Sequence, residues 1–291
     1  MILVAGGTGR LGSRVVGSLV EQGRSVRVLA RGSTEGLCPG AEVVRGDVAD
    51  DGAVARAVSG VDTVVSAVTG FPRQRSSVVD RDGNHRLVEA AEREGAEVVL
   101  VSVVGASPHS PVELMRSKHA AEERVRACAV PWTVLRLDVC TETWVDVLVQ
   151  SARASRRPVV LGDADNPLGW LSVRDAAALV ERTVLDGGPR GRTLSLSGPD
   201  RLSLGGLARV VMVDRGWDGA PRRVPRGVLR AAAHTVGAAV PLVGRLSRMA
   251  LEMDRMPPTH DDAREQVPGL PSTPARTVSA ALAREPVARS G

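Results

Sequence analysis

The sequence contains no tyrosine and a single phenylalanine, so aromatic residues make up only 2% of its 291 residues. A nucleic-acid-binding surface needs a basic stripe with stacking aromatics, whereas the arginines here are interspersed with acids. Although the net charge is +5 and the sequence pI is 10.2, this mixing of arginines with acids predicts a solvated, salt-bridged surface and no nucleic-acid partner.

Cysteines and long apolar runs are also scarce. Cys38, Cys128 and Cys140 are odd in number and lack zinc-ligand spacing, which argues against a disulfide framework and against a metal site. The first apolar run, residues 1–5, meets glycine too early for a signal peptide, and no later run reaches the roughly 18 residues of a membrane span. We therefore expect a cytoplasmic monomer without a membrane partner, with a sizeable core from its 43% apolar residues.

The N-terminal half alternates short apolar runs with helical patterns. We expect strands at 1–5, 26–30, 42–45, 61–67, 98–104 and 132–137, and helices at 11–21, 53–58, 83–94 and 112–128. Strands that alternate with helices at this spacing form right-handed βαβ units. The fold class predicted is α/β, with a Rossmann-like, doubly wound parallel sheet.

After about residue 140 the alternation loosens. Short strands are expected at 159–161 and 193–197, helices at 173–185, 204–213 and 273–284, and an apolar helical segment at 220–258. We therefore predict two domains. Residues 1–150 form a cofactor-binding Rossmann domain, and residues 151–291 form a smaller, mixed but mostly helical substrate lobe, with 193–197 available to complete the first sheet.

A glycine-rich motif, GGTGRLG at residues 6–12, follows the first predicted strand and opens a helix. Glycine allows the tight turn, the close approach of a pyrophosphate and the contact of helix with strand, and the helix N-terminus attracts phosphate. Its position inside a βαβ unit makes the motif specific for dinucleotides. The residues expected to cradle the pyrophosphate are Gly6, Thr8, Gly9, Arg10, Leu11 and Gly12.

The end of the second strand indicates which dinucleotide binds. An NAD site places an acid there for the ribose 2′-hydroxyl, but this strand ends in Arg31, and no acid follows before Glu35. A guanidinium suits a 2′-phosphate, so we expect Arg31 and Ser33 to select NADPH over NADH. The residues expected at the adenine are Asp47 and Val48, and those expected along the ribose are Ala67 and Val68.

Several further motifs occur in a fixed order: Gly46-Asp47-Val48, the segment from Asp80 to Ala91, Leu100-Val101-Ser102, Lys118 with Glu122, 132–136 and 196–199. Together with the glycine motif, over residues 1–215, they resemble the NmrA-like, atypical extended short-chain dehydrogenase/reductases (SDRs). The resemblance implies a Rossmann sheet, bound NAD(P)(H) and a Ser-Tyr-Lys active site. In that site the tyrosine passes a proton to the carbonyl oxygen, and the lysine orients the ribose.

The chain departs from this active-site pattern. The tyrosine position, four residues before Lys118, is Leu114, and the implied serine falls on Val103 or Val104, with Ser102 nearby. Lys118 is nevertheless the only lysine among 38 basic residues, at a place where a guanidinium would not fit in the same way. We therefore expect Lys118 to fix the nicotinamide ribose, with Ser102 assisting.

Three interpretations of the missing tyrosine remain open. A ketone flanked by a phenol, as in aromatic polyketides, carries its own acid. Alternatively, a side chain donates the proton; His109, in the loop after the fifth strand, is the best placed of a set that includes His85, His119 and Asp138. In the third, the protein is a non-catalytic, NADP(H)-binding redox-sensing regulator of the NmrA type.

We favour the first interpretation, an NADPH-dependent ketoreductase of an aromatic polyketide in antibiotic biosynthesis, similar to the angucyclinone-type enzymes. An apolar Leu114 leaves room for a flat polycyclic aromatic substrate, and the apolar helical segment after residue 220 suits such a ligand. The residues expected to contact the substrate are Met115, Trp144 and His109.

Overall fold

The computed structural model describes residues 1–71, 75–234 and 240–284, and the chain divides into two compact units. The first unit comprises Met1–Leu137, Arg174–Leu196 and Asp261–Pro271. The second comprises Asp138–Val173, Ser197–His260 and Ser272–Gly291. The predicted single boundary after residue 150 differs from this division, because segments far along the chain return to the first unit.

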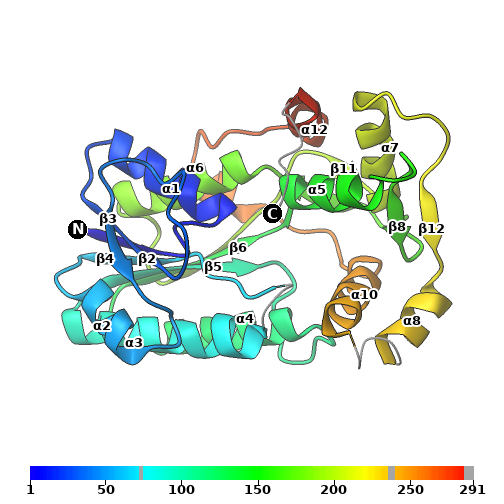
Figure 1. The fold of residues 1–291 in the computed structure, drawn as a ribbon. Coiled ribbons are helices and arrows are strands. Elements are labelled where there is room, and N and C mark those ends of the chain that lie inside the picture. The colour runs from blue at the N-terminus through cyan, green and yellow to red at the C-terminus, as the bar shows by residue number, and fades with distance from the viewer. Residues whose placement is uncertain (72–74, 235–239, 285–291) are drawn as a thin grey trace. The chain divides into compact units, whose positions relative to one another are not determined.

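A seven-stranded parallel sheet forms the centre of the first unit (Figure 1). Its strands are β1 (Ile2–Ala5), β2 (Val26–Ala30), β3 (Glu42–Arg45), β4 (Thr63–Ser66), β5 (Glu97–Val103), β6 (Trp132–Leu137) and β10 (Arg192–Leu196). Their order is β10-β6-β5-β4-β1-β2-β3, and every pair is parallel. This order confirms the predicted Rossmann-like class, and it reverses direction between β1 and β4.

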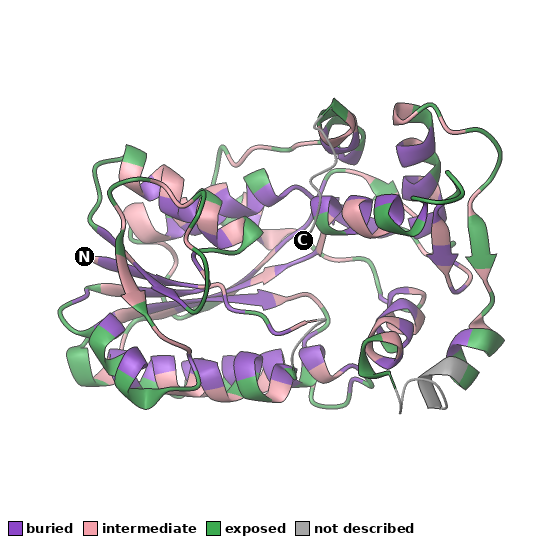
Figure 2. Ribbon diagram, in the orientation of Figure 1, coloured by how far each residue is buried: buried purple, intermediate pink, exposed green. Residues whose placement is uncertain are grey.

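Helices cover both faces of this sheet (Figure 1). One face carries α1 (Arg10–Glu21) and α6 (Val173–Leu185), where Ser18 donates a hydrogen bond to Glu181. The other carries α2 (Asp51–Val58), α3 (Asn84–Glu94) and α4 (Glu113–Arg126). A π-helix, η1 (Ser77–Gly83), leads directly into α3. The central strands β1, β4 and β5 are buried from both sides, which explains their nearly continuous apolar sequence (Figure 2).

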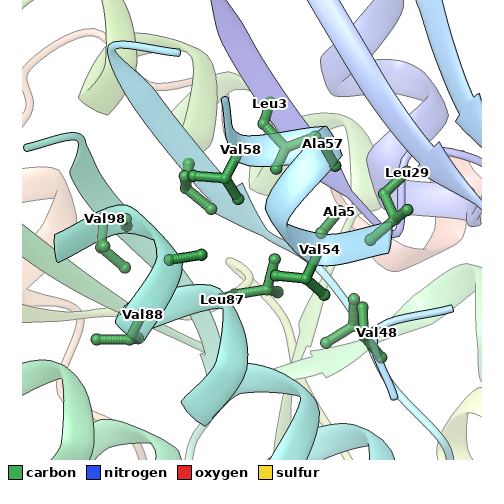
Figure 3. Close-up of a cluster of buried hydrophobic side chains, with 14 of the residues drawn as sticks. Leu3, Ala5, Leu29, Val48, Val54, Ala57, Val58, Leu87, Val88 and Val98 are labelled. Carbon is green, nitrogen blue, oxygen red and sulfur yellow. The ribbon is translucent and has the colours of Figure 1, made fainter. Parts of the chain in front are cut away.

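The core between the sheet and helices α2 and α3 is built from aliphatic side chains (Figure 3). Leu3 and Leu100 from the strands and Val54 and Leu87 from the helices are almost completely buried there. Their burial fixes which face of each helix turns inward. It also holds the carboxyl ends of the strands in register.

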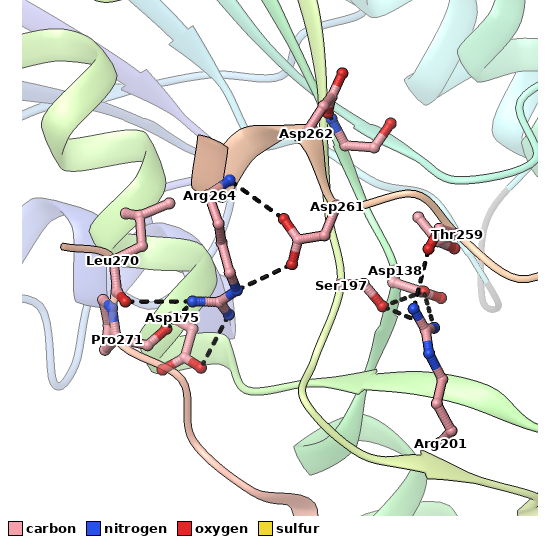
Figure 4. Close-up of polar contacts among 11 residues, drawn as sticks. Asp138, Asp175, Ser197, Arg201, Thr259, Asp261, Asp262, Arg264, Leu270 and Pro271 are labelled. Atoms are coloured by element: carbon pink, nitrogen blue, oxygen red, sulfur yellow. Dashed lines mark hydrogen bonds and ion pairs between the residues drawn. The ribbon is translucent and has the colours of Figure 1, made fainter. Parts of the chain in front are cut away.

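The contacts of one arginine, Arg264, explain why the segment Asp261–Pro271 belongs to the first unit (Figure 4). Arg264 of α11 (Asp262–Gln266) pairs with Asp261 at 2.9 Å and lies 3.9 Å from buried Asp175 on α6. It also donates hydrogen bonds to the carbonyl oxygens of Leu270 and Pro271. Contacts across some ninety residues of sequence cannot be inferred from local pattern.

The second unit combines short strands with helices. A three-stranded sheet contains β7 (Val139–Cys140), β9 (Leu168–Leu171) and β11 (Arg201–Leu202), and a two-stranded sheet contains β8 (Val159–Leu161) and β12 (Arg222–Val224). Its helices are α5 (Thr141–Ser151), α7 (Leu204–Asp214), α8 (Arg226–His234), α10 (Pro241–Met253) and α12 (Ala275–Arg284).

The second unit departs from the sequence prediction in two respects. The expected helical segment 220–258 begins with strand β12, and its residues 235–239 lie outside the described residues. Helix α5 was not expected, although Val145, Leu148 and Val149 have helical spacing. The predicted boundary at residue 150 falls inside this helix.

Candidate functional site

A cavity of about 470 Å³ lies in the first unit at the carboxyl ends of β1, β2, β3 and β4. It spans the point at which the strand order reverses, where ligands bind in open α/β sheets. The lining residues are Gly6, Thr8, Gly9, Leu29, Arg31, Gly32, Ser33, Gly46, Val48, Ala67, Val68, Thr69 and Val79.

The turn between β1 and α1 has the close backbone contacts that a dinucleotide site requires. Gly6 has a φ of +83°, and a Cβ atom there would lie 2.7 Å from the carbonyl oxygen of Ala67. A Cβ atom on Gly12 would overlap the carbonyl oxygen of Gly6. Gly9 caps α1 without a side chain, and the first turn of α1 has no acidic residue to offset the positive end of the helix dipole. This turn therefore fits a pyrophosphate.

Two arginines lie beside the loop that follows β2. Arg31 places its Nη1 atom 3.3 Å from Oδ2 of Asp47, and both side chains are partly exposed. Arg45, at the end of β3, donates hydrogen bonds to the Gly32 carbonyl oxygen and to the Thr34 hydroxyl. Arg45 was not predicted to lie here, although it directly follows the apolar pair of β3 in the sequence.

Most of the residues predicted for the cofactor line the cavity. They are Gly6, Thr8, Gly9, Arg31, Ser33, Val48, Ala67 and Val68. In the part of the chain that the structure describes, the lining does not include Arg10, Leu11, Gly12, Asp47 or Lys118. The lining residue Val79 was not expected, because the π-helix that carries it has no recognisable sequence pattern.

Lys118 is buried on α4, with its side chain only 4% exposed. Its Nζ donates hydrogen bonds to the carbonyl oxygens of Val68, at 2.8 Å, and Val101, at 3.0 Å. The same atom forms an ion pair with Oδ1 of Asp80 at 3.3 Å, and that oxygen accepts no hydrogen bond from the described residues. The ammonium group therefore lies directly behind the cavity-lining segment that contains Val68.

Ser102 lies in a different polar group of the core. Its hydroxyl, almost completely buried, donates to Oε1 of Glu122 at 2.6 Å. Arg136 and Arg126 also donate to Glu122. Burial alone would raise the pKa of Glu122, but the hydrogen bonds from Arg136 and Ser102 and the charge of Arg136 lower it below its ordinary value. The Ser102 hydroxyl thus donates its hydrogen bond to Glu122. Ser102 is not among the described residues that line the cavity.

The other expected active-site residues are dispersed. Leu114 and Met115 are both buried on α4, and His109 is exposed in the loop after β5. Trp144 belongs to the second unit, where it is buried on α5. In that unit Asp138 accepts a hydrogen bond from the Ser197 hydroxyl at 2.8 Å (Figure 4).

Residues 6–153 match a family model described as NAD(P)H-binding. The chain belongs to this NAD(P)H-binding family. A (4-alkanoyl-5-oxo-2,5-dihydrofuran-3-yl)methyl phosphate reductase from Streptomyces griseus is 33% identical to it over 211 residues, which cover 70% of each chain. An NAD(P)H azoreductase from Xenophilus azovorans is 28% identical over 212 residues, again covering 70% of each.

The fold of this NAD(P)H-binding chain extends over nearly the whole of a solved structure. An NADPH-dependent quinone oxidoreductase from Escherichia coli, complexed with NADPH, superposes with a TM-score of 0.80 at 21% identity, covering 97% of this chain and 99% of that one. Family membership confirms the predicted NAD(P)H cofactor. With reductases among the relatives, it also confirms an NAD(P)H-dependent oxidoreductase.

Within residues 1–71, 75–234 and 240–284, no group of histidine, cysteine and acidic side chains is arranged to hold a metal ion. None of the helices in this part of the chain has the length and apolar character needed to cross a membrane.

Proposed function

We propose that this protein reduces a phenol-bearing polycyclic ketone with NADPH and that the substrate itself supplies the proton to the carbonyl oxygen. The observation that carries the proposal is Leu114, an apolar side chain at the position from which the related SDRs deliver the proton. The Ser102 hydroxyl donates a hydrogen bond to Glu122, and the Lys118 ammonium donates to two backbone carbonyl oxygens and forms an ion pair with Asp80.

The cofactor roles follow from the cavity. When bound, NADPH supplies the hydride for the carbonyl carbon. The glycine turn and the N-terminus of α1 hold the pyrophosphate, and Arg31 and Ser33 hold the 2′-phosphate. Val48 borders the adenine, and Ala67 and Val68 lie along the ribose. We also propose that the protein is a cytoplasmic monomer. Its three cysteines lack disulfide-type spacing, which is typical of a reducing compartment.

The proton requirement sets the substrate class. An alkoxide that develops during hydride transfer needs a proton or a strong hydrogen bond. A phenol next to the ketone provides both within one molecule, at a high effective concentration. The names of the two reductase relatives support reduction of a small molecule, and neither names such a ketone. The ketone is therefore inferred from Leu114 rather than from the relatives.

A pair of substrates tests this proposal. A polycyclic ketone with an adjacent phenol is compared with its methyl ether, and oxidation of NADPH is followed by absorbance. We expect turnover of the phenol and a loss of about 100-fold or more with the ether, the usual range for a missing general acid. Equal rates with both ketones would contradict the proposal.

Variants at Leu114 provide the matched test. Leu114→Tyr restores the proton donor of the related SDRs and is expected to raise turnover of the ether. Leu114→Phe adds the ring without the hydroxyl and is expected to leave the ether unreduced. If both variants behave alike, the site lacks the geometry that the proposal assumes.

A second candidate is the non-catalytic NADP(H)-binding regulator. It is favoured by the Lys118 ammonium, which is already surrounded by protein oxygens. Tight NADPH binding without oxidation by any phenolic ketone of a broad panel would support this candidate.

A further inference from the structure

We infer that Lys118 and Asp80 form a buried clamp that positions residues 67–70 against the dinucleotide. This inference rests on the proposed dinucleotide site, and it gives Lys118 a role other than the direct contact with the ribose that the family resemblance implies. In this role Lys118 and Asp80 are positioning residues.

The ammonium group of Lys118 donates hydrogen bonds to two backbone carbonyl oxygens and forms an ion pair with one carboxylate. Val68 follows β4, Val101 lies in β5 and Asp80 lies in η1, so one cation joins three segments. The side chains of Lys118 and Asp80 are 4% and 0% exposed.

Asp80 holds the same segment from its other side. Its Oδ2 accepts a hydrogen bond from the Gly70 N–H at 2.9 Å. Its carbonyl oxygen accepts from Nδ2 of Asn84 at 2.6 Å, and Oδ1 of Asn84 accepts from the hydroxyl of Ser66 at 2.5 Å. The segment after β4 is therefore tied at its start, at Val68 and at its end by one buried network.

This segment forms one wall of the cavity. Ala67, Val68 and Thr69 all line it, and Val79, the residue before Asp80 in η1, lines it as well. A shift of the clamp therefore moves two parts of the wall together. Short π-helical segments occur frequently at functional sites, and η1 places Val79 and Asp80 in adjacent positions for these two tasks.

The clamp also gives a physical reason for the only lysine in the chain. A guanidinium presents five N–H donors in a rigid plane, whereas an ammonium presents three on a compact group. Two carbonyl oxygens and one carboxylate oxygen lie around the Lys118 ammonium in an enclosed space. Arginine, which supplies every other basic side chain of this kind, would bring donors that this space does not satisfy.

The test compares Asp80→Asn, Lys118→Met and the double variant. Each single change leaves a buried charge without its partner and is expected to lower Tm and to weaken NADPH binding by about tenfold or more. The double variant removes both charges and is expected to regain much of the lost Tm. Its Kd for NADPH is expected to remain at least about tenfold weaker, because residues 67–70 are no longer tied.

Two further measurements separate positioning from general stability. Hydrogen exchange of a peptide that covers residues 67–70 is expected to accelerate in a further variant, Asp80→Ala, because the Gly70 N–H then loses its side-chain acceptor. The matched control is Glu122→Gln. Glu122 is a carboxylate as fully buried as Asp80, and it lies one turn after Lys118 on α4. Glu122→Gln is expected to lower Tm while its Kd for NADPH stays within about twofold of wild type.

The outcomes are decisive in both directions. A double variant that regains wild-type Kd together with Tm would overturn the clamp, as would single variants with unchanged Kd. A lower kcat at saturating NADPH with unchanged Kd would return Lys118 to the ribose. Binding is measured without turnover, so failure of the ketone assay and failure of the clamp are distinguishable.

Discussion

Replacing Arg31 with alanine is expected to weaken NADPH binding far more than NADH binding. Arg31 lines the cavity with its side chain 49% exposed, and its nearest acid, Asp47, lies 3.3 Å away. An exposed ion pair of this kind contributes about 0–1 kcal/mol, so it competes weakly with a phosphate for the guanidinium.

The magnitude follows from the charge of the 2′-phosphate. A hydrogen bond to a charged partner contributes about 1.5–3 kcal/mol, and every 1.4 kcal/mol corresponds to about a tenfold change in Kd. After allowing for the competing ion pair with Asp47, Arg31→Ala should raise the Kd for NADPH by about 10- to 100-fold. The Kd for NADH should stay within about threefold, because NADH has no 2′-phosphate.

Titration of the apoprotein with each dinucleotide, by calorimetry or by nicotinamide fluorescence, measures both values. Asp47→Asn is the matched variant. It removes the competing charge while its amide oxygen can still accept the Ala49 N–H, and it should tighten NADPH binding by up to about fivefold. Both effects should shrink at high salt.

Two results would refute this reasoning. Equal weakening of NADPH and NADH by Arg31→Ala would mean that Arg31 acts by holding the loop rather than by binding phosphate. Unchanged affinity for both dinucleotides would mean that another cation binds the phosphate, and Arg45, at the end of β3 and hydrogen-bonded to the same loop, is a candidate.

Three further predictions concern the turn, the buried acid and the core. Gly12→Ala places a Cβ atom against the Gly6 carbonyl oxygen and should lower the free energy of unfolding by about 1–3 kcal/mol. In titrations it should weaken the binding of NADPH and of NADH to the same extent. The pKa of Glu122 is lowered in the folded state, so the Glu122 carboxylate stabilises the folded protein at neutral pH. This stabilisation is lost as the pH falls from 4.5 through the folded pKa, and Glu122→Gln should reduce that loss in urea unfolding at acidic pH. Leu100→Ala removes a fully buried side chain and should cost about 2–5 kcal/mol in urea unfolding at neutral pH.

Controls and opposing results are available for each of these. Gly17→Ala, at a glycine with open space around it, should leave NADPH binding unchanged, and equal effects at both glycines would contradict the crowding at Gly12. If Glu122→Gln leaves the pH dependence of the free energy of unfolding unchanged at acidic pH, the loss of stability arises from other carboxylates. Val213 is 79% exposed, so Val213→Ala should change stability by less than about 0.5 kcal/mol, and a loss matching Leu100→Ala would contradict the core assignment.

Much of the first unit was predictable because its signals are local. Strands buried on both faces consist almost wholly of apolar residues, as in β1 and β5, and the glycines that end them mark sharp turns. The short strands of the second unit give no such signal. β9 contains Gly169 between buried neighbours, and β12 is three residues long and largely exposed. Their pairing depends on partners that lie far away in sequence.

The residues of the candidate site also differ in whether a local sequence signal marks them. The glycine turn and Arg31 were predictable, because each follows directly from its place at the end of a strand. Ser102 was expected beside the ribose, yet it lies against Glu122, because a single residue of register decides which face of β5 a side chain takes. Asp80 was not expected as a partner of Lys118 at all.

The sequence by itself determined the Rossmann sheet, the dinucleotide turn and the loss of the tyrosine, because each depends on residue types within one short segment. Only the tertiary structure decided what Lys118 contacts, since its two carbonyl acceptors lie 17 and 50 residues before it in the chain. The physical reason is that a buried charge is held by whichever oxygens the fold brings around it, and packing between distant segments sets those oxygens.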